Sequence, residues 1–471
     1  MRILRKKTTL ESKFQRASRF LTKGEFQKST VLLQQVLREA LHSSLWDFAG
    51  KAHAKLGRAF FLQGNYGDAK SAYSWAEFFA KKASDLRALN ISLNGLGLVN
   101  LKMGNPEIAQ EYLEYALSLG RSIKDLNRIT ASLNNLGLVH RHLGNLSEAV
   151  KHYEEARGYL QKTGQTNVLF AVLINLATIY HMQGELDQSD QLFDECLAMA
   201  ENDPERVGIL KLNWSYNEFA RDTPKSAARL LREGLEKINQ HGIGGSLRTN
   251  LHLGLTQALI ELKQPEEAME ILKTIEAEIS QTHPMGHAEL LYLYGRLSAT
   301  IHQRKKAANY YQRALSKAQE LPDLYIELSS LVRLAEIALR EFESSSDETK
   351  MELAIAKVDQ ALQLAARESI YPIFIEVTTL RALLSASLCM FDRAQTELRS
   401  ALKLAEDREL SNSAKKIKEN MKFVKTQQQV LTAYGNLDSE AETQVRELSF
   451  QQFRSYLKDV EAIARALPGS R

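Results

Sequence analysis

The sequence has little cysteine, proline or glycine for its length. Its 471 residues include 2 Cys, 8 Pro and 24 Gly. Cys196 and Cys389 lie far apart and neither belongs to a CxxC motif, which excludes a disulfide scaffold and a cysteine-based zinc site. The low Pro and Gly content argues against collagen-like, proline-rich and loop-dominated all-β architectures.

The chain also lacks a long apolar run and an excess of charge of either sign. No stretch reaches the roughly 18 apolar residues of a membrane span, and no apolar signal region follows the basic N-terminus. Lys and Arg number 61 against 57 Asp and Glu, a formal net charge of +4. This balance argues against a general nucleic-acid coat. We expect a cytoplasmic protein with no membrane span and no specific nucleic-acid partner.

A 40-residue repeat is the strongest signal in the sequence. Four copies align without gaps and carry Leu, Gly or other small residues at five shared positions. The five sets are Leu56, Leu96, Leu136 and Leu176; Gly57, Gly97, Gly137 and Ala177; Gly64, Gly104, Gly144 and Gly184; Ala69, Ala109, Ala149 and Ser189; and Ala76, Ala116, Ala156 and Cys196. Stepping back another 40 residues predicts a degenerate first copy that begins near residue 9.

Each copy predicts two amphipathic helices, because apolar residues recur at helical spacing on both sides of the third set of positions, all Gly. Gly favours the left-handed conformation that ends a helix. Small residues at the other positions let helices approach to about 8–10 Å. A single hairpin of this kind cannot bury its own apolar face, so neighbouring hairpins must stack.

This pattern resembles the tetratricopeptide repeat family, whose motif runs Leu-Gly, Gly, Ala, Ala at these spacings. The 40-residue period is similar to that of the long-helix subgroup, which includes kinesin light chains, Pins-type adaptors and MalT-like helical sensor arms. The resemblance covers roughly residues 45–200 well and weakens after that. It implies an all-α fold, a right-handed superhelical solenoid of about ten repeats.

The predicted solenoid spans 1–405 and is followed by a capping helix at 406–435 and an amphipathic segment at 436–471. A polar stretch at 343–349 predicts an extended loop inside the ninth repeat. The repeats are expected near 9–48, 49–88, 89–128, 129–168, 169–206, 207–247, 248–286, 287–326, 327–373 and 374–405.

Motifs for catalysis are missing. The sequence has no HExxH, GxSxG or paired-carboxylate motif, and Gly242-Ile-Gly-Gly-Ser lacks the Lys-Ser/Thr ending of a phosphate-binding loop. His140 and His142 are two residues apart, so on a helix they point to different sides and cannot share a metal ion. We therefore predict a non-enzymatic protein with no cofactor and no metal.

The resemblance also implies where a ligand would bind. In this family the first helix of each repeat faces a concave groove through six motif positions. Carried onto repeats two to six, these give 30 positions, none of which is Asp or Glu, whereas the composition of the chain leads us to expect about three or four. Five of the 30 are Lys or Arg and two are His, so the predicted groove is basic and favours an acidic ligand.

Asparagines recur in the same predicted groove. Asn135, Asn175 and Asn213 hold one motif position in three consecutive repeats, and Asn94 and Asn134 precede it by one residue. A carboxamide has both a donor and an acceptor, so a row of them suits the backbone of an extended peptide. Kinesin light chains and Pins-type adaptors resemble this sequence here, since they use such a row. Asn can also bond within its own repeat. The predicted peptide-binding residues are Asn94, Asn134, Asn135, Asn175, Asn213, Lys55, Arg58, Lys102, Arg141, His142 and His181.

Two functions remain open at this point. The first is a non-enzymatic adaptor or scaffold that binds an extended, acidic peptide segment of a protein partner in the groove. The second is a regulatory sensor module for a small ligand or peptide that acts in trans. The C-terminal segment carries Asp438, Glu440, Glu442 and Glu447 before an apolar face. It could therefore either cap the array or fold back as an intramolecular inhibitor.

Overall fold

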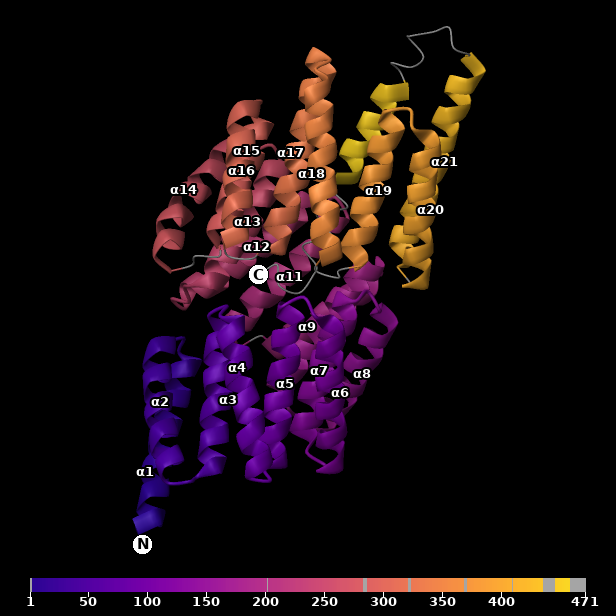
Figure 1. The fold of residues 1–471 in the computed structure, drawn as a ribbon. Coiled ribbons are helices and arrows are strands. Elements are labelled where there is room, and N and C mark those ends of the chain that lie inside the picture. The colour runs from indigo at the N-terminus through magenta and orange to yellow at the C-terminus, as the bar shows by residue number, and fades with distance from the viewer. Residues whose placement is uncertain are drawn as a thin grey trace. The chain divides into compact units, whose positions relative to one another are not determined.

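A computed structural model describes residues 2–200, 202–282, 286–320, 323–367, 371–408, 410–434 and 445–457. Every regular element within these ranges is a helix (Figure 1), as the sequence predicted. None of these helices combines the length and the hydropathy that crossing a membrane requires. The helices are α1 (Arg2–Thr22), α2 (Phe26–His42), α3 (Trp46–Leu62), α4 (Tyr66–Lys82), α5 (Leu86–Lys102), α6 (Pro106–Ser122), α7 (Leu126–His142), α8 (Leu146–Thr163), α9 (Thr166–Gln183), α10 (Leu186–Ala200), α11 (Pro204–Ala220), α12 (Pro224–Gln240), α13 (Ser246–Glu261), α14 (Pro265–Thr282), α15 (Gly286–Thr300), α16 (Arg304–Glu320), α17 (Leu324–Ser345), α18 (Glu348–Arg367), α19 (Tyr371–Ser387), α20 (Phe391–Asp407) and α21 (Ser411–Tyr434), and residues 445–457 are also helical.

The chain divides into two compact units. The first unit comprises residues 1–140 and 148–165, and the second comprises residues 141–147 and 166–471. Within each unit, consecutive helices pack against one another as hairpins. The predicted all-α superhelical repeat is therefore confirmed.

The turns explain why the repeat pattern is clear early in the chain and weak later. The five turns after α1, α3, α5, α7 and α9 use Gly with φ between 73° and 80°. In the later repeats Asp222, Lys263, His302 and Cys389 take the equivalent left-handed conformation, with φ between 56° and 60°. A side chain in this region is strained by roughly 1–2 kcal/mol. The turn geometry is thus retained where the Gly signal is lost.

The small residues of the motif make room for side chains of the adjacent helix. A Cβ added at Gly137 would lie 2.5 Å from the ring of Tyr153, and one added at Gly295 would lie 2.6 Å from the ring of Tyr311. Both tyrosine side chains are almost fully buried. Gly at these positions therefore lets an aromatic ring pack directly on the backbone of the first helix of a hairpin.

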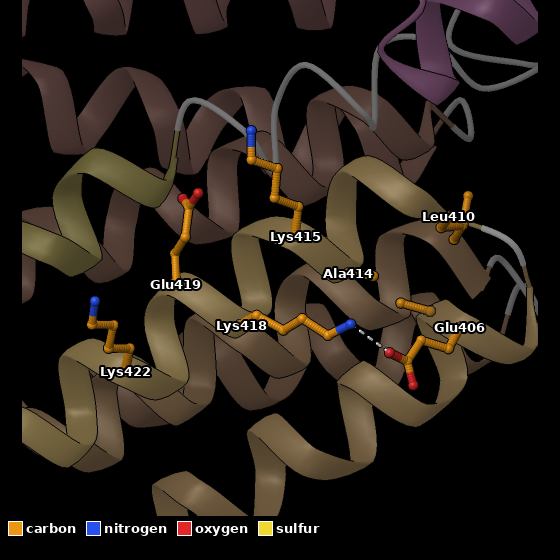
Figure 2. Close-up of a pocket in the computed structure, with 8 residues that line it drawn as sticks. Glu406, Leu410, Ala414, Lys415, Lys418, Glu419 and Lys422 are labelled. Atoms are coloured by element: carbon orange, nitrogen blue, oxygen red, sulfur yellow. Dashed lines mark ion pairs between the residues drawn. The ribbon is translucent and has the colours of Figure 1, made fainter.

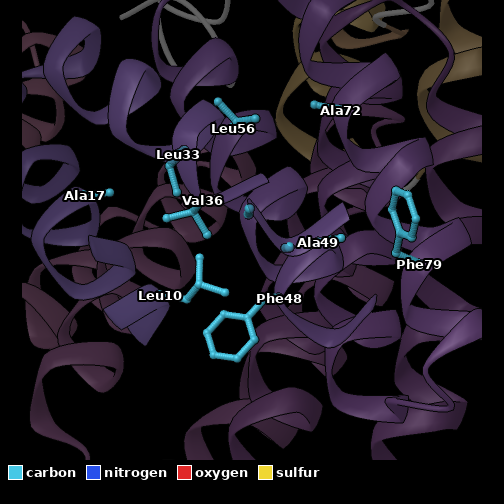
Figure 3. Close-up of a cluster of buried hydrophobic side chains, with 11 residues drawn as sticks. Leu10, Ala17, Leu33, Val36, Phe48, Ala49, Leu56, Ala72 and Phe79 are labelled. Atoms are coloured by element: carbon cyan, nitrogen blue, oxygen red, sulfur yellow. The ribbon is translucent and has the colours of Figure 1, made fainter. Parts of the chain in front are cut away.

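The apolar core lies between the packed helices of each unit. Figure 3 shows its N-terminal part, where Leu10 of α1, Val36 of α2 and Phe48 of α3 pack in one cluster with Phe79 of α4. These four side chains are at most 6% exposed. The degenerate first repeat is thus a genuine hairpin that covers the apolar face of the second.

The odd-numbered helices form an inner row. Besides packing against the helices that adjoin them in sequence, most of them also touch another odd-numbered helix. In a curved stack, the helices on the inside lie closest together, so these helices line the inner face of each unit. The contacts of this kind join α1 with α3, α3 with α5, α9 with α11, α11 with α13, α13 with α15, α15 with α17 and α19 with α21.

The predicted extended loop at 343–349 is wrong. Helix α17 continues to Ser345 and α18 begins at Glu348, so the turn between them is only two residues long. The hydroxyl groups of Ser344 and Ser345 both donate hydrogen bonds to the Glu341 carbonyl of the preceding turn. The polar residues therefore continue helix α17 into solvent and do not form a long loop.

Candidate functional site

Charge is segregated between the two rows of the first unit. In the parts of α3, α5 and α7 that belong to this unit, Asp47 is the single carboxylate, whereas six residues are Lys or Arg. The outer helices α4, α6 and α8 carry eight carboxylates and seven Lys or Arg residues. The six inner cations are Lys51, Lys55, Arg58, Arg87, Lys102 and Arg128.

Three of these cations lie together without a counter-ion. Burial and the positive charges of Arg58 and Arg128 lower the pKa of the Lys55 amine. The side chains of all three have no ion-pair or hydrogen-bond partner within the described ranges, and the buried Nε of Arg128 is one of the polar atoms left unsatisfied there. Arg87, by contrast, pairs with Asp125 at 2.9 Å. The middle of α3 and the start of α7 therefore present uncompensated positive charge.

The predicted row of asparagines is partly linked by internal hydrogen bonds. Asn94 is only 8% exposed. Its Nδ2 donates to the Asn90 carbonyl at 3.0 Å and to the Ser132 hydroxyl at 3.0 Å, and its Oδ1 accepts from Asn135 Nδ2 at 3.0 Å. Asn134 Nδ2 in turn lies 3.5 Å from Asn135 Oδ1. Asn94 thus orients the Asn135 side chain through a hydrogen bond. The sequence did not indicate this link, because Asn94 is itself oriented by buried Asn90 and Ser132.

The other asparagines differ in how strongly they are held. Asn213 is half-buried and donates to the Ile209 carbonyl of its own helix at 2.8 Å. Asn134, Asn135 and Asn175 are also half-buried. All four keep part of their surface in contact with solvent on the inner row, so their role in binding a peptide stays a prediction.

The remaining predicted residues fall into three environments. Arg58 is exposed, and Lys55 and Lys102 are half-buried. Arg141 and His142, at the end of α7, are only 7% and 6% exposed. Their contact with a ligand likewise stays a prediction.

His181 belongs to a polar cluster that joins α9, α10 and α11. Its Nδ1 lies 2.8 Å from Asn217 Oδ1, and Asn217 Nδ2 donates to Asp190 at 2.7 Å. Asp190 also pairs with Arg221 at 2.8 Å. Burial lowers the pKa of His181, although the hydrogen bond with Asn217 opposes that shift. His181 therefore helps to fix the packing of three helices as a neutral imidazole.

The inner row of the second unit is covered near its end by the chain itself. Residues 445–457 bring Tyr456 to the Glu376 carboxylate of α19, which accepts a hydrogen bond from its hydroxyl. Arg454 pairs with Glu343 of α17 at 2.7 Å. Phe453 and Leu457 are both 0% exposed. This helix therefore packs on α17 and α19 as part of the core of the second unit.

Two surface pockets lie apart from the predicted residues. The larger, about 790 Å³, lies between α20 and α21 (Figure 2) and is lined in part by Lys415, Lys418, Lys422 and Glu419. Lys418 points across it to Glu406, with which it pairs at 2.8 Å. A smaller pocket of about 370 Å³ is lined by residues of α1 and α2 with Ser43. In the part of the chain that the structure describes, no three His, Cys, Asp or Glu residues are grouped as metal ligands.

Comparison with known proteins identifies the repeat. The sequence model of the tetratricopeptide repeat matches residues 88–162 and 128–202. Residues 88–202 therefore carry tetratricopeptide repeats. No curated protein matches this sequence.

Solved structures of tetratricopeptide repeat-like fold share its architecture. The apo form of the quorum sensor NprR from B. thuringiensis is 13% identical with a TM-score of 0.52, over 74% of this chain and 99% of that one. The apo form of RapI is 11% identical with a TM-score of 0.50, over 76% of this chain and 98% of that one. A putative kinesin light chain repeat array from Podosopora anserina is 20% identical over 41% of this chain and 94% of that one, but its TM-score of 0.35 says nothing about the subgroup. The likenesses to NprR and RapI establish the fold.

Proposed function

We propose that this protein is a non-enzymatic interaction module that binds an extended, acidic peptide segment along the inner row of α3, α5 and α7. The observation that carries the proposal is the separation of charge in the first unit. In this unit α3, α5 and α7 hold six Lys or Arg residues against one carboxylate, whereas α4, α6 and α8 hold eight carboxylates. A surface of this kind attracts acidic partners and rejects basic ones.

The apolar residues between the cations support a peptide rather than a small anion as the ligand. Phe61 and Leu98 are partly exposed on the same helices. Such side chains offer apolar anchor positions, while the neighbouring Asn134 and Asn135 amides offer hydrogen bonds to a peptide backbone. The preferred ligand is therefore an extended segment with acidic residues on either side of apolar ones.

The direct test compares two labelled peptides on the full-length protein. One is a fluorescein-labelled 12-residue peptide with four Glu flanking two Leu, and the other replaces each Glu with Gln. Fluorescence anisotropy should give at least tenfold tighter binding of the Glu peptide, because only that peptide neutralises the inner cations. Equal affinity for the two peptides would refute an acidic specificity.

The role of the asparagines is tested separately. The double substitution Asn134→Ala and Asn135→Ala on α7 should weaken the Glu peptide by roughly fivefold or more, which corresponds to about one lost hydrogen bond. Gln110→Ala on the outer helix α6 is the matched control and should leave affinity unchanged. Wild-type affinity in the double variant would remove the asparagines from the site.

A regulatory sensor that acts in trans is the second candidate. The alignment with the quorum sensor NprR, which spans 99% of that chain, favours this candidate. Residues 445–457 favour it too, because they pack over inner helices of the second unit. In this candidate a ligand would displace that intramolecular helix. Thermal-shift screening separates the two functions, since stabilisation by metabolites favours the sensor and stabilisation by acidic peptides favours the adaptor. Deleting residues 436–471 should raise ligand affinity if the segment inhibits, and should only lower stability if it caps.

A further inference from the structure

We propose that the pocket between α20 and α21 is a nucleotide-binding site that takes a free ribonucleoside 5′-phosphate. The pocket has a volume of about 790 Å³, which lies within the range of roughly 300–1,000 Å³ that small-ligand sites occupy. It belongs to the second unit, whereas the proposed peptide surface belongs to the first. The inference therefore goes beyond the proposed function and does not depend on it.

The pocket lies on the face of α21 that is turned away from the core of the second unit. The opposite face of this helix is buried. There Ser413 donates a hydrogen bond to Glu376 of α19 at 2.5 Å, and Asn420 accepts one from Gln452 at 2.6 Å. The charged residues of α21 that line the pocket recur at helical spacing and are all exposed, namely Lys415, Lys418, Glu419 and Lys422. The core of the unit therefore does not use these four side chains.

One end of the pocket is apolar. Its lining there consists of Ala405 of α20, Leu410 in the turn and Ala414 of α21, which are all buried. Two of the three are alanines, so a ligand can approach this end closely without meeting a bulky side chain. A flat, largely apolar body such as a nucleobase would cover this surface and remove the rest of it from water.

The rest of the pocket is charged, and part of that charge has no partner. Lys418 turns across the pocket to Glu406 and pairs with it at 2.8 Å (Figure 2). Glu419 and Lys422 lie further along α21 and have no ion-pair or hydrogen-bond partner among the described residues. Figure 2 shows that their side chains extend to the same side of the helix. A hydroxyl donor beside an anionic group would satisfy both of them.

The order of these groups along α21 matches the three parts of a nucleotide. From Ala414 to Lys422 the helix rises about 12 Å, which is close to the length of a nucleoside monophosphate. The base would cover the apolar end, the ribose hydroxyl groups would donate to Glu419, and the phosphoryl group would accept from Lys422. Lys415, also without a partner in the described ranges, would donate to an acceptor atom of the base. A simple carboxylate or phosphate ion would leave the apolar end and Glu419 unmatched.

Titration of the four common ribonucleoside 5′-monophosphates into the full-length protein tests the site. Isothermal titration calorimetry should give a Kd below about 1 mM for at least one of them, with one molecule bound per chain. The matching nucleoside and inorganic phosphate should each bind at least tenfold more weakly, because each fills only part of the pocket. The site is overturned if none of the four binds up to about 10 mM, or if inorganic phosphate binds as tightly as the best nucleotide.

Substitutions of exposed lysines test the phosphoryl contact. Lys422→Gln should weaken the nucleotide at least fivefold and leave the nucleoside unchanged, since only the phosphoryl group contacts this amine. Lys425→Gln is the matched control, because it removes the same charge one turn further along α21, from an exposed residue outside the pocket lining. Both variants should keep the thermal midpoint of wild type. An equal loss of affinity in the two variants would show a general electrostatic attraction and refute the site.

The ribose contact is tested by a double-mutant cycle. Glu419→Gln should weaken the ribonucleotide about threefold, and use of the 2′,3′-dideoxy nucleotide should weaken binding to wild type by a similar factor. The two changes together should cost little more than either alone, because they remove the same hydrogen bond. Additive losses would place the sugar away from Glu419 and contradict the proposed arrangement.

Two further measurements check the ligand class and the independence of the pocket. A single-stranded tetranucleotide of RNA should bind no more tightly than its monomer, and a tenfold preference for it would assign the pocket to an RNA strand in place of a free nucleotide. The 12-residue Glu peptide should bind Lys422→Gln and wild type equally. A loss of peptide affinity in this variant would make the pocket part of the peptide surface and overturn the separate site.

Discussion

The inner rows of the two units use the same helix arrangement in opposite ways. In the first unit, Lys55, Arg58 and Arg128 have no counter-ion among the described residues. In the second unit, Glu336 pairs with Arg333 at 2.8 Å and with Arg340 at 2.7 Å. Burial alone would raise the pKa of Glu336, but the charges and hydrogen bonds of these two arginines lower it. Among the described residues these three cations of the first inner row therefore lack a counter-ion, whereas Glu336, Arg333 and Arg340 on the second neutralise one another.

Surface coverage follows the same division. Residues 445–457 pack on α17 and α19 with Phe453 and Tyr456 buried, so the end of the second inner row serves the stability of its own unit. In the first unit Arg58 remains exposed and Asn135 half-buried. Repeats of one fold thus divide into a part with exposed cations on its inner helices and a part whose last inner helices are covered by residues 445–457.

The largest effect is expected when the packing of residues 445–457 in the second unit is removed, which tests the difference between the two units. Phe453→Ala should cost the second unit about 3–5 kcal/mol in free energy of unfolding, the usual loss for truncating a buried Phe. Urea denaturation followed at Trp214, in a background with Trp46→Phe and Trp75→Phe, reports on this unit. Leu448→Ala is the control, since Leu448 is 44% exposed. Equal losses for both would mean that the last helix does not close the unit.

The second largest effect concerns the first unit alone. Gly95→Ala should destabilise it by about 1–3 kcal/mol, because the new Cβ would lie 2.3 Å from the buried ring of Tyr73 and force overpacking. Gly158→Ala on α8 meets open space and should stabilise by up to about 1 kcal/mol from helix propensity. Denaturation followed at Trp46 and Trp75, with Trp214→Phe, measures both. Stabilisation by Gly95→Ala would contradict the packing of Tyr73 between α3 and α5.

The stability of the first unit should also fall on mild acidification. His53 stacks on Trp75 and Phe79, and burial lowers its pKa to about 4. The folded pKa lies below the unfolded value of about 6.5, so the unfolded state binds the proton more tightly. Stability is complete above pH 6.5 and is lost as the pH falls towards 4. Between pH 7 and pH 5 the loss should be about 1–2 kcal/mol.

The matched variant for this prediction is His53→Phe, which keeps an aromatic ring among its neighbours but cannot be protonated. Its free energy of unfolding, followed at Trp46 and measured at pH 7 and pH 5, should change less than that of wild type by that amount. An identical pH dependence in both proteins would show that other groups govern the acid response of this unit.

The smallest expected effect is on binding. Affinity of the 12-residue Glu peptide should fall about threefold to tenfold as salt rises from 50 mM to 500 mM, because the Debye length shortens from about 14 to 4 Å. The Gln peptide should respond weakly. An affinity for the Glu peptide that stays constant up to molar salt would contradict a basic binding surface and erase the contrast between the two units.

Much of the fold could be predicted because each repeat is specified by residues close together in the sequence. Gly64, Gly104 and Gly144 marked the turns, and helical spacing marked the two helices of each hairpin. The turns at Lys263 and His302 have the same left-handed backbone, but a side chain at φ > 0 leaves no sequence signature. The error at 343–349 has a local cause too, since polar residues are equally compatible with a loop and with an exposed helix end.

The candidate site was less predictable, because its contacts join residues far apart in sequence. The motif positions identified Lys55 and Arg58 on the first helix of a repeat, but they did not indicate that the charge of Arg128 acts on Lys55. Nor did they show that Asn94 is held by Ser132, 38 residues away. The predicted acidic residues Asp438, Glu440 and Glu442, with the end of the amphipathic face, lie outside the described residues.

The junctions between repeats have a consequence for how such a chain can change length. Ser84 and Lys124 adopt the same backbone conformation, with φ of 52° and 53°. The aspartates that follow them, Asp85 and Asp125, each accept a hydrogen bond from the backbone N–H three residues on. Excising residues 85–124 would join two ends that already share one geometry. Gain or loss of a whole hairpin by unequal recombination would therefore leave the backbone conformation of this junction unchanged. The array can in this way become longer or shorter by 40 residues at a time.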